Sequence, residues 1–490
     1  MHTFFWHDYE TFGAVPRQDR PSQFAGIRTD AELNEIGEPL MLYCQPAPDY
    51  LPAPEACLLT GITPQHCLAH GVAEHEFAGV IERELAAPGT IGVGYNSLRF
   101  DDEVSRFLFW RNLIDPYARE WQNQCGRWDM LDLVRATYVL RPEGIEWPQH
   151  EDGRPSFKLE HLSAANGLLH EAAHDALSDV RATIALARLI KQKQPKLFDF
   201  YLSLHKKDAV KAQLNLHRPQ PLLHVSGMYG VERGNMAIVW PLAQHPTNGN
   251  EVIVWDLAFD PAMLRGLSAD TIRQRIYTRT EELPEGVTRL PLKTIHINKS
   301  PFVVANLKVL GADRAAHWGV DMVQIQQHAA SAAALPDLTP IWRQVYRREA
   351  GEPRDVDENL YGGFVSNNDR KVLNKLRLKS AAQLTGEMAF FEDAQLGELL
   401  LRYRARNFPD SLSGEESQRW QAWCRHKLQD GVGGRSLAQF QQEMAAVRAR
   451  ELTPAQQDFP DSLSGEESQR WQAWCRHKLQ DGVGGRSLAQ

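Results

Sequence analysis

The first carboxylates of interest lie at the end of an apolar segment, Thr3-Phe4-Phe5-Trp6, in the order Asp8-Tyr9-Glu10. Side chains alternate along a β-strand with period two, so Asp8 and Glu10 are expected to project from one face of a sheet. Two like charges held this close are costly unless a cation lies between them. Oxygen ligands suit hard divalent cations such as Mg²⁺. The pair therefore predicts a metal site, although a solvated strand end has the same pattern.

Two more acidic residues and a histidine lie next to predicted helices. Residues 90–96 are typical of a buried strand, and Asp101 is expected in the first turn of the following helix, where backbone N–H groups favour a carboxylate. His174 lies just ahead of an amphipathic helix predicted over residues 176–193, and Asp179 lies about one turn into it. Both side chains can therefore face one point.

The motifs Asp8-x-Glu10, Asn96-x-x-x-Phe100-Asp101 and His174-x-Ala176-x-x-Asp179 resemble the signature of the DEDDh superfamily of 3′→5′ exonucleases. Longer strings resemble the bacterial exonuclease I family within it, at residues 7–13, 94–104, 140–145, 224–228, 296–299 and 401–409. The resemblance covers roughly residues 3–410. Three motifs in order, with further strings outside that domain, make it highly specific.

The resemblance implies a metal-dependent 3′→5′ exonuclease that degrades single-stranded DNA to 5′-mononucleotides in DNA repair and recombination. The carboxylates would hold two Mg²⁺ ions, for which Mn²⁺ is a possible substitute; these ligands are Asp8, Glu10, Asp101 and Asp179. Glu10 would also act in catalysis and contact the substrate, and His174 would accept the proton of the attacking water. Lys158 stands where the family typically has an arginine on the substrate phosphate, and lysine lacks the bidentate fork.

Single-strand binding without sequence preference needs aromatic stacking and backbone charge. The positions that the resemblance implies for this role are Arg106, Tyr117, Trp121, Arg135, Arg141 and Phe200. Arg106 and Arg135 fit a helix surface equally well, and Trp121 fits a core. The resemblance also implies docking of the acidic C-terminal tail of single-stranded-DNA-binding protein, and a monomer.

Two other functions stay open. One is a DEDDh exonuclease that acts on RNA or proofreads for a polymerase, and the accessory domains count against it. The other is a non-catalytic scaffold that binds single strands, which the intact set of four acids and a histidine disfavours.

Pattern shifts along the chain predict three domains. Residues 1–190 alternate strands and helices, which indicates an α/β domain with a mixed central sheet, and the resemblance implies the ribonuclease-H-like exonuclease fold. Residues 195–348 contain short β-like runs, such as 236–240 and 252–255, and correspond to the family's SH3-like domain. Residues 351–458 are typical of an α-helical C-terminal domain, with the boundary near residues 351–353.

Composition bounds the class of protein. The 490 residues are 43% hydrophobic and 24% charged, as in ordinary globular proteins. No apolar run approaches the ~20 residues that a membrane helix needs, and no signal peptide is recognised, so a cytoplasmic protein is expected, associated with the nucleoid during repair. The six cysteines lack metal-ligand spacing and predict reduced, buried thiols. The net charge of −8 argues against a protein that coats nucleic acid but permits a locally basic groove.

One segment occurs twice. Residues 408–439 recur letter for letter as residues 459–490. Structural repeats diverge at positions outside the core, so 32 identical residues indicate a recent duplication, or an error in the gene or its assembly, rather than a functional repeat. The second copy is expected to be dispensable for activity.

Overall fold

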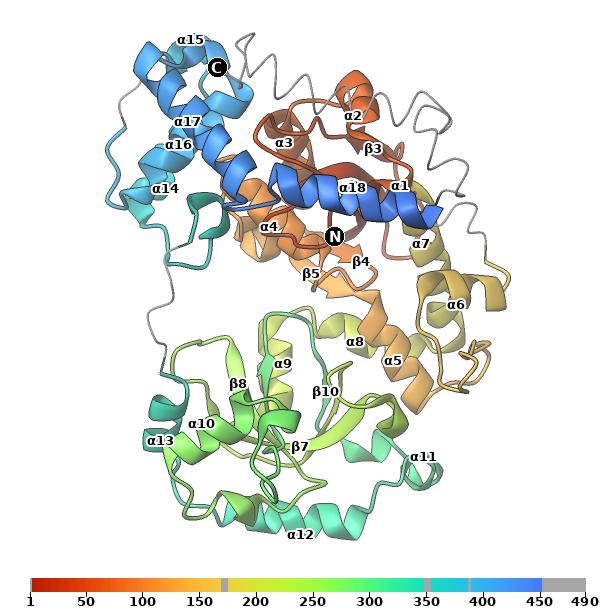
Figure 1. The fold of residues 1–490 in the computed structure, drawn as a ribbon. Coiled ribbons are helices and arrows are strands. Elements are labelled where there is room, and N and C mark those ends of the chain that lie inside the picture. The colour runs from red at the N-terminus through yellow and green to blue at the C-terminus, as the bar shows by residue number, and fades with distance from the viewer. Residues whose placement is uncertain (1, 169–174, 348–353, 387–388, 452–490) are drawn as a thin grey trace.

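The computed structural model describes residues 2–168, 175–347, 354–386 and 389–451. Two five-stranded sheets and a set of C-terminal helices make up this part of the chain. We call the described residues up to 193 the N-terminal domain, 195–347 the middle domain and 354–451 the C-terminal domain. In Figure 1 the C-terminal helices pack beside the N-terminal domain, and the second sheet lies on its other side. The boundary expected at residues 351–353 falls outside the described residues.

The first sheet is mixed, as predicted, with strand order β3-β2-β1-β4-β5. β1 pairs antiparallel with β2 and parallel with β4, β2 pairs antiparallel with β3, and β4 pairs parallel with β5. The strands are β1 (Thr3–Thr11), β2 (Pro21–Thr29), β3 (Leu40–Tyr43), β4 (Thr90–Gly94) and β5 (Gly126–Asp129). The helices are α1 (Pro54–Thr60), α2 (Pro64–His70), α3 (Glu74–Leu85), α4 (Asp101–Arg111), α5 (Met130–Leu140), α6 (Leu159–Ala165) and α7 (Ala176–Lys193).

The side chains of β1 alternate between two hydrophobic cores. Trp6 packs in one cluster with residues of α5 and α7, whereas Tyr9 packs in another with residues of α3 and α4. Since the period along a strand is two, Asp8 and Glu10 project from the face of Trp6, which α7 crosses. The sheet thereby aims its two carboxylates at that helix.

The second sheet is antiparallel between every pair of neighbours, in the order β10-β6-β7-β8-β9. Its strands are β6 (Leu222–Val225), β7 (Met236–Gln244), β8 (Glu251–Asp256), β9 (Leu292–His296) and β10 (Phe302–Val304). The helices of the middle domain are α8 (Pro195–Ser203), α9 (Lys207–Leu214), α10 (Ala269–Tyr277), α11 (Ala312–His317), α12 (Met322–Ala333) and α13 (Thr339–Val345).

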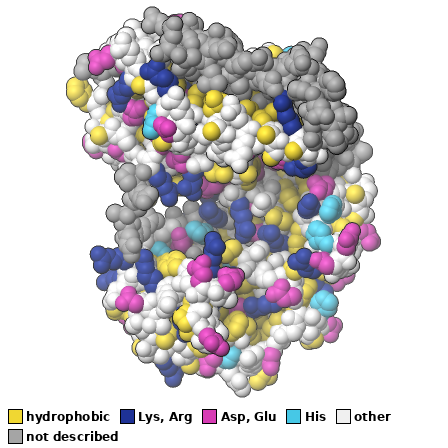
Figure 2. Space-filling model, in the orientation of Figure 1, with side chains coloured by type: hydrophobic (Ala, Val, Ile, Leu, Met, Phe, Trp, Pro, Cys, Tyr) yellow, Lys and Arg dark blue, Asp and Glu magenta, His cyan; other side chains and the backbone are white. Residues whose placement is uncertain are grey.

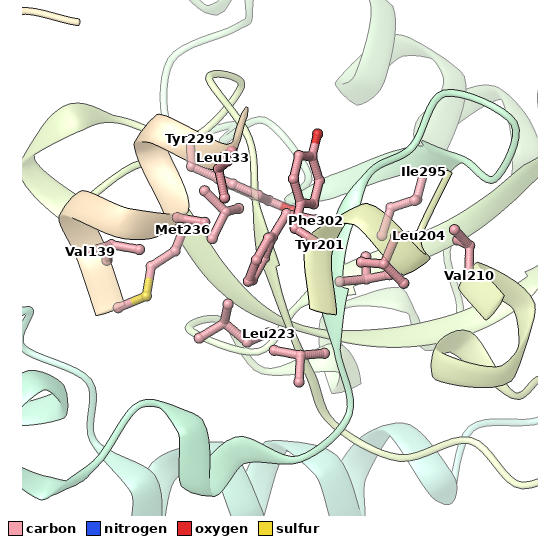
Figure 3. Close-up of a cluster of buried hydrophobic side chains, with 14 of the residues drawn as sticks. Leu133, Val139, Tyr201, Leu204, Val210, Leu223, Tyr229, Met236, Ile295 and Phe302 are labelled. Carbon is pink, nitrogen blue, oxygen red and sulfur yellow. The ribbon is translucent and has the colours of Figure 1, made fainter. Parts of the chain in front are cut away.

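The N-terminal and middle domains share one hydrophobic core. Figure 3 shows Leu133 and Val139 of α5 near Met236 of β7, and Tyr201 of α8 beside Phe302 of β10. The rings of Tyr201 and Phe302 lie 5.6 Å apart between centroids. Because separating the domains would expose this apolar surface to water, the core holds the second sheet in a fixed place beside the first.

Two hydrophobic clusters contain residues of both the C-terminal and the N-terminal domain. Its helices are α14 (Asn367–Leu376), α15 (Ala381–Leu384), α16 (Gln395–Asn407), α17 (Gly414–Asp430) and α18 (Leu437–Glu451). Trp110 of α4 lies in a cluster with residues of α14 and α16, and its Nε1 donates to the carbonyl oxygen of Val356 at 2.8 Å. Phe440 of α18 packs in another cluster with Cys57 of α1, and Figure 1 shows α18 running beside α1.

The helix predicted over residues 176–193 has those bounds in the structure, and α4 begins at Asp101 as expected. The short elements α1, α2 and β5 were not predicted. The described cysteines Cys44, Cys57, Cys67, Cys125 and Cys424 are buried and free of disulfides, as expected. Among the described helices, none has the length and apolar content needed to cross a bilayer.

Candidate active site

Three carboxylates from β1 and α7 converge. One side-chain oxygen from each of Asp8, Glu10 and Asp179 lies within 4.8 Å of the other two. Asp8 and Glu10 share a face of β1, and Asp179 stands in the first turn of α7, which packs against β1 and β2. The fold therefore brings the first and third sequence motifs together.

Asp101 adds a fourth carboxylate from the start of α4. Its Oδ1 accepts a hydrogen bond from the backbone N–H of Tyr9 at 3.1 Å. Tyr9 lies between Asp8 and Glu10 in β1, so the second motif meets the first at the strand itself. Asp101 is 3% exposed, and its place at the beginning of the helix is the one that the sequence predicted.

The shifted pKa values of these acids reflect burial and mutual repulsion. Burial, followed by the charge of Asp179, raises the pKa of Glu10 to about 8. Burial and the neighbouring Asp102 raise the pKa of Asp101 to about 8. Burial and Asp101 also raise the pKa of Asp8 well above its ordinary value. Among the described residues, no Lys or Arg forms an ion pair with Asp8, Glu10 or Asp101.

The donor set fits a hard divalent cation. All of the candidate ligand atoms are carboxylate oxygens, the donors that Mg²⁺ and similar ions prefer. A cation among them would remove the repulsion that raises their pKa values. Asp8, Glu10, Asp101 and Asp179 are therefore the residues that would hold it.

His174 lies outside the described residues, and so does the second copy of the repeat, residues 459–490. The next residue, Asp175, caps α7: its Oδ2 accepts a hydrogen bond from the backbone N–H of Ser178 at 3.1 Å. The cap fixes the helix start that directly follows His174 in the chain.

Asp129, which the sequence reasoning missed, orders the loop before Asp101. Its carboxylate accepts hydrogen bonds from the backbone N–H groups of Asn96 at 2.9 Å and Leu98 at 3.1 Å. Asn96 has a φ of 62°, a left-handed conformation that Asn tolerates better than most residues. Asp129 also caps α5 through the N–H of Leu131 at 2.9 Å. The sequence signal for it is an Asp directly before the apolar, helix-forming run of residues 130–140, where Asp is a favoured N-cap.

Lys158 lies at the N-terminus of α6 and lines a groove of about 1310 Å³. The same groove is lined by Tyr95, Asn96 and Arg135. The Nζ of Lys158 is 3.3 Å from Oε1 of Glu160, and the side chain is 63% exposed. Its ammonium group is therefore accessible from the groove.

The first three residues expected to contact DNA lie on α4 and in the loop after it. Arg106 is buried, and its guanidinium is bonded to Glu103 at 2.7 Å and to Glu120 at 2.7 Å. Its guanidinium carbon lies 5.3 Å from the ring centre of Tyr117. Trp121 is 67% exposed, which excludes the core position that its sequence also allowed.

The other three lie in or next to the middle domain. Arg135 borders two neighbouring cavities, and its Nη1 is 2.9 Å from Oδ1 of Asp132. Nη1 of Arg141 donates to the carbonyl oxygen of Val309 at 2.9 Å. The ring of Phe200 lies 5.9 Å from that of Phe302. The six residues therefore spread along the molecule rather than forming one cluster.

Figure 2 shows the molecule hollowed between the middle domain and the rest, with Lys and Arg side chains gathered on the walls. A cavity of about 500 Å³ lies where the loop after β4 faces β9. Its charged lining residues are Arg99, Arg135, Lys293, Lys299, Asp129, Asp132 and Glu251. Lys and Arg side chains therefore gather at this hollow in a protein whose net charge is −8, while the cavity itself has a mixed lining of basic and acidic groups.

Four carboxylates make up this site: two come from the central strand of a mixed sheet, one from α4 and one from α7. This arrangement is that of a metal-dependent exonuclease of the DEDDh class. Comparison with protein families agrees over three segments of the chain. Residues 5–187 match the "Exonuclease" family model, 205–348 the "Exonuclease I SH3-like domain" and 354–458 the "Exonuclease I C-terminal domain". The chain belongs to the exonuclease I family, and the expected three-part fold is confirmed.

Two relatives with established names are similar to this chain in sequence over most of their length. Exodeoxyribonuclease I of Haemophilus influenzae is 47% identical over 430 residues, which cover 87% of this chain and 91% of the relative. Exodeoxyribonuclease I of Escherichia coli K12 is 47% identical over 424 residues, which cover 85% of this chain and 88% of the relative.

Solved structures show the same fold. A moderately thermophilic exonuclease I from Methylocaldum szegediense has a TM-score of 0.90 at 44% identity, covering 98% of this chain and 100% of its own. E. coli exonuclease I in complex with a dA16 oligonucleotide has a TM-score of 0.88 at 42% identity, with the same coverage. A zinc-bound form of the E. coli complex with single-stranded DNA has a TM-score of 0.85 at 42% identity and covers 97% of this chain and 99% of its own.

Proposed function

We propose that this protein is a divalent-metal-dependent 3′→5′ exonuclease that degrades single-stranded DNA and releases 5′-mononucleotides. The observation that carries the proposal is the convergence of Asp8, Glu10 and Asp179, with Asp101 bonded to the backbone between the first two. The relatives named exodeoxyribonuclease I, and the complexes of the E. coli enzyme with oligonucleotides, support DNA as the substrate.

We infer that the four carboxylates bind two Mg²⁺ ions, with Mn²⁺ as a substitute. When bound, these ions would supply an activated water and charge stabilisation at the phosphoryl oxygens. The protein's own part is to hold the oxygens in place: β1 fixes Asp8 and Glu10, α4 fixes Asp101, and α7 fixes Asp179.

His174 is proposed as the general base that takes the proton from the attacking water, because a neutral imidazole can accept a proton near neutral pH. Glu10 is proposed to contact the terminal nucleotide in addition to metal. Lys158, exposed on the wall of the large groove, would contact the substrate phosphate as a single point charge.

The upstream strand is proposed to follow the basic hollow. The exposed indole of Trp121 and the ring of Tyr117 would stack on bases, while Arg135, Arg141 and Phe200 would contact the strand nearer the middle domain. The guanidinium of Arg106 is shared between Glu103 and Glu120, so we expect it to order Tyr117 more than to neutralise a phosphate.

Further proposals concern the cellular setting. A monomer that acts in cytoplasmic DNA repair and recombination, near the nucleoid, would meet single strands already coated by single-stranded-DNA-binding protein. We propose that it docks that protein's acidic C-terminal tail, and electrostatic pairing of this kind weakens as salt rises. A tail peptide titrated at low and high salt tests this, and absence of binding at low salt would contradict it.

The test of the function is digestion of 5′-labelled oligonucleotides by the full-length protein. Single-stranded DNA should shorten from its 3′ end with Mg²⁺ and stay intact with EDTA, while 3′-blocked DNA, duplex DNA and RNA should be degraded far more slowly. Preferential digestion of RNA would favour the related RNA-directed activity. Binding without metal-dependent cleavage would favour the scaffold.

A further inference from the structure

Gln23 is a buried amide next to the catalytic carboxylates. It lies on β2 directly opposite Glu10 in the β1–β2 pairing, and its surface is 1% exposed. Directly opposed residues share a face of the sheet, so Gln23 points toward the face that α7 crosses. A polar group buried there needs hydrogen-bond partners.

The Gln23 amide is bonded at both ends, and two of its three partners begin α7. Its Nε2 donates to Oδ1 of Asp175 at 3.3 Å, and its Oε1 accepts from the backbone N–H of Ala176 at 3.2 Å. Nε2 also donates to the phenol oxygen of Tyr43 on β3 at 3.3 Å. One side chain thus ties two strands of the sheet to the start of the helix.

Through its hydrogen bond to Asp175, Gln23 contacts the residue that caps the first turn of α7. Asp175 caps that turn through Ser178, and the backbone N–H of Asp179 donates to the carbonyl oxygen of Asp175 at 3.0 Å. A shift of Asp175 along the sheet would therefore carry Asp179 with it. Carboxylate oxygens that converge within 4.8 Å leave little room for such a shift.

We propose that Gln23 is a positioning residue for the metal site: through Asp175 and Ala176 it holds the first turn of α7, and with it Asp179, against β1. The inference rests on the proposed function, because it assigns Gln23 to the metal site of that enzyme. It also fixes the chain at the residue that directly follows His174. Gln23 acts through α7 and needs no contact of its own with metal or substrate.

The test is Gln23→Met in the full-length protein, which keeps the side-chain length and removes all three hydrogen bonds. We expect Mn²⁺ affinity, measured by calorimetry, to fall about 10–100-fold, the usual effect of losing a group that orients a metal ligand. kcat should fall with it at fixed metal, whereas KM for single-stranded DNA should change little because most of the proposed strand contacts lie along the hollow, away from Gln23. Thermal unfolding reports whether the variant is folded.

Gln213→Met is the matched control. Gln213 is a half-buried glutamine on α9, and its Oε1 accepts from the backbone N–H of Ala305 at 2.8 Å, away from the carboxylates. The control variant is expected to lose stability through that bond but to keep wild-type Mn²⁺ affinity. A purely structural role for Gln23 would make the two variants alike.

A double-mutant cycle locates the effect. Because Gln23 acts through Asp175, Gln23→Met combined with Asp175→Ala should weaken Mn²⁺ binding by less than the sum of the single changes. Wild-type Mn²⁺ affinity in folded Gln23→Met, or additive effects in the cycle, would overturn the inference. Should Gln23→Met not fold, Gln23→Asn keeps the amide one methylene short of α7, and unchanged affinity there would overturn it equally. Failure of the proposed function would show differently, as a wild-type protein without metal-dependent nuclease activity.

Discussion

Glu10 and Asp49 are both buried carboxylates, but the fold surrounds them differently. Burial and the neighbouring Asp179 raise the pKa of Glu10 to about 8. Burial alone would raise the pKa of Asp49 too, but Arg406 and Lys427 outweigh it and hold that pKa well below its usual range. The Nη2 of Arg406 lies 2.7 Å from Oδ2 of Asp49, and the Nζ of Lys427 lies 3.0 Å from the same oxygen.

The ion pairs of Asp49 join the N-terminal domain to the C-terminal domain. Arg406 also pairs with Asp357 at 2.5 Å, and Arg402 pairs with Asp357 at 3.2 Å, all within a buried network. Its charges are balanced by the protein itself. By contrast, Asp8 and Glu10 on β1 and Asp101 on α4 form no ion pair with a Lys or Arg of the described residues. The comparison indicates that basic side chains of the protein balance the acidic site of Asp49, whereas the donor set of the other site suits a divalent cation.

The largest effect is expected from Asp179→Asn, which removes one of the carboxylates that converge with Asp8 and Glu10. Hydrolysis of single-stranded DNA should fall below detection, because one of three converging ligands is lost, while strand binding over the long groove should persist. Asp313→Asn, at an exposed aspartate of α11, is the matched control and should keep full activity. Activity of Asp179→Asn within about tenfold of wild type, a barrier change near 1.4 kcal/mol, would contradict the assignment.

His174→Ala separates proton transfer from metal binding at the same site. We expect turnover to fall by about 10²–10⁴-fold, the usual contribution of general acid–base catalysis. Calorimetric affinity for Mn²⁺ should be unchanged. If affinity is lost instead, His174 is a metal ligand and the carboxylate site extends to it.

Arg406→Met removes the ion pairs of Arg406 with Asp49 and Asp357. It leaves Asp49 and Asp357 short of a cation, and removing one partner of a buried pair costs about 3–5 kcal/mol in free energy of unfolding. Denaturant titration measures it, with Arg450→Met as control, since Arg450 pairs with Glu55 at 2.9 Å in an exposed position and should cost about 0–1 kcal/mol.

The pH dependence of this effect has a definite sign. The pKa values of Asp49 and Asp357 are depressed in the folded protein, so their contribution is present above the unfolded value of 3.8 and is lost as pH falls below it. The difference between wild type and Arg406→Met should therefore shrink in acid. Equal stability of the two proteins at neutral pH would contradict a structural role for the network.

The smallest effect is expected from truncation after Gln457, which removes the second copy of the repeat. The first copy already fills its docking surface, since Trp420 is buried and Lys427 is paired with Asp49. Activity on short strands and the unfolding midpoint should stay the same. Limited proteolysis should cut between Gln439 and Phe459 before it cuts the catalytic domain. A truncated protein that unfolds or loses activity would show that residues 459–490 are an integral part of the fold.

Local pattern was enough to predict much of the site. The period of a strand put Asp8 and Glu10 on one face, and helix-start rules put Asp101 in the first turn of α4. The four-residue strand β5 and the helices α1 and α2 were missed because such short segments carry too few periodic positions.

Contacts between distant segments could not be read from the sequence. The role of Gln23 depends on the register that sets it opposite Glu10, and the charge of Arg106 is balanced by Glu120 from a loop. The pairing of Arg406 with Asp49 joins two domains. In each case the partner is chosen by tertiary packing, which local propensity does not encode.

Metal binding to the EDTA-treated protein, followed by calorimetry in buffers of different ionisation enthalpy, tests the central claim most directly. Burial and mutual repulsion raise the pKa values of Glu10 and Asp101 to about 8, so both are expected to hold protons at neutral pH in the metal-free protein. A cation must displace those protons, so saturable Mn²⁺ binding should release more protons near pH 7 than near pH 9, which lies above the pKa values of Glu10 and Asp101. Asp179→Asn should bind far more weakly. Absence of saturable binding, or binding at neutral pH without proton release, would contradict the account.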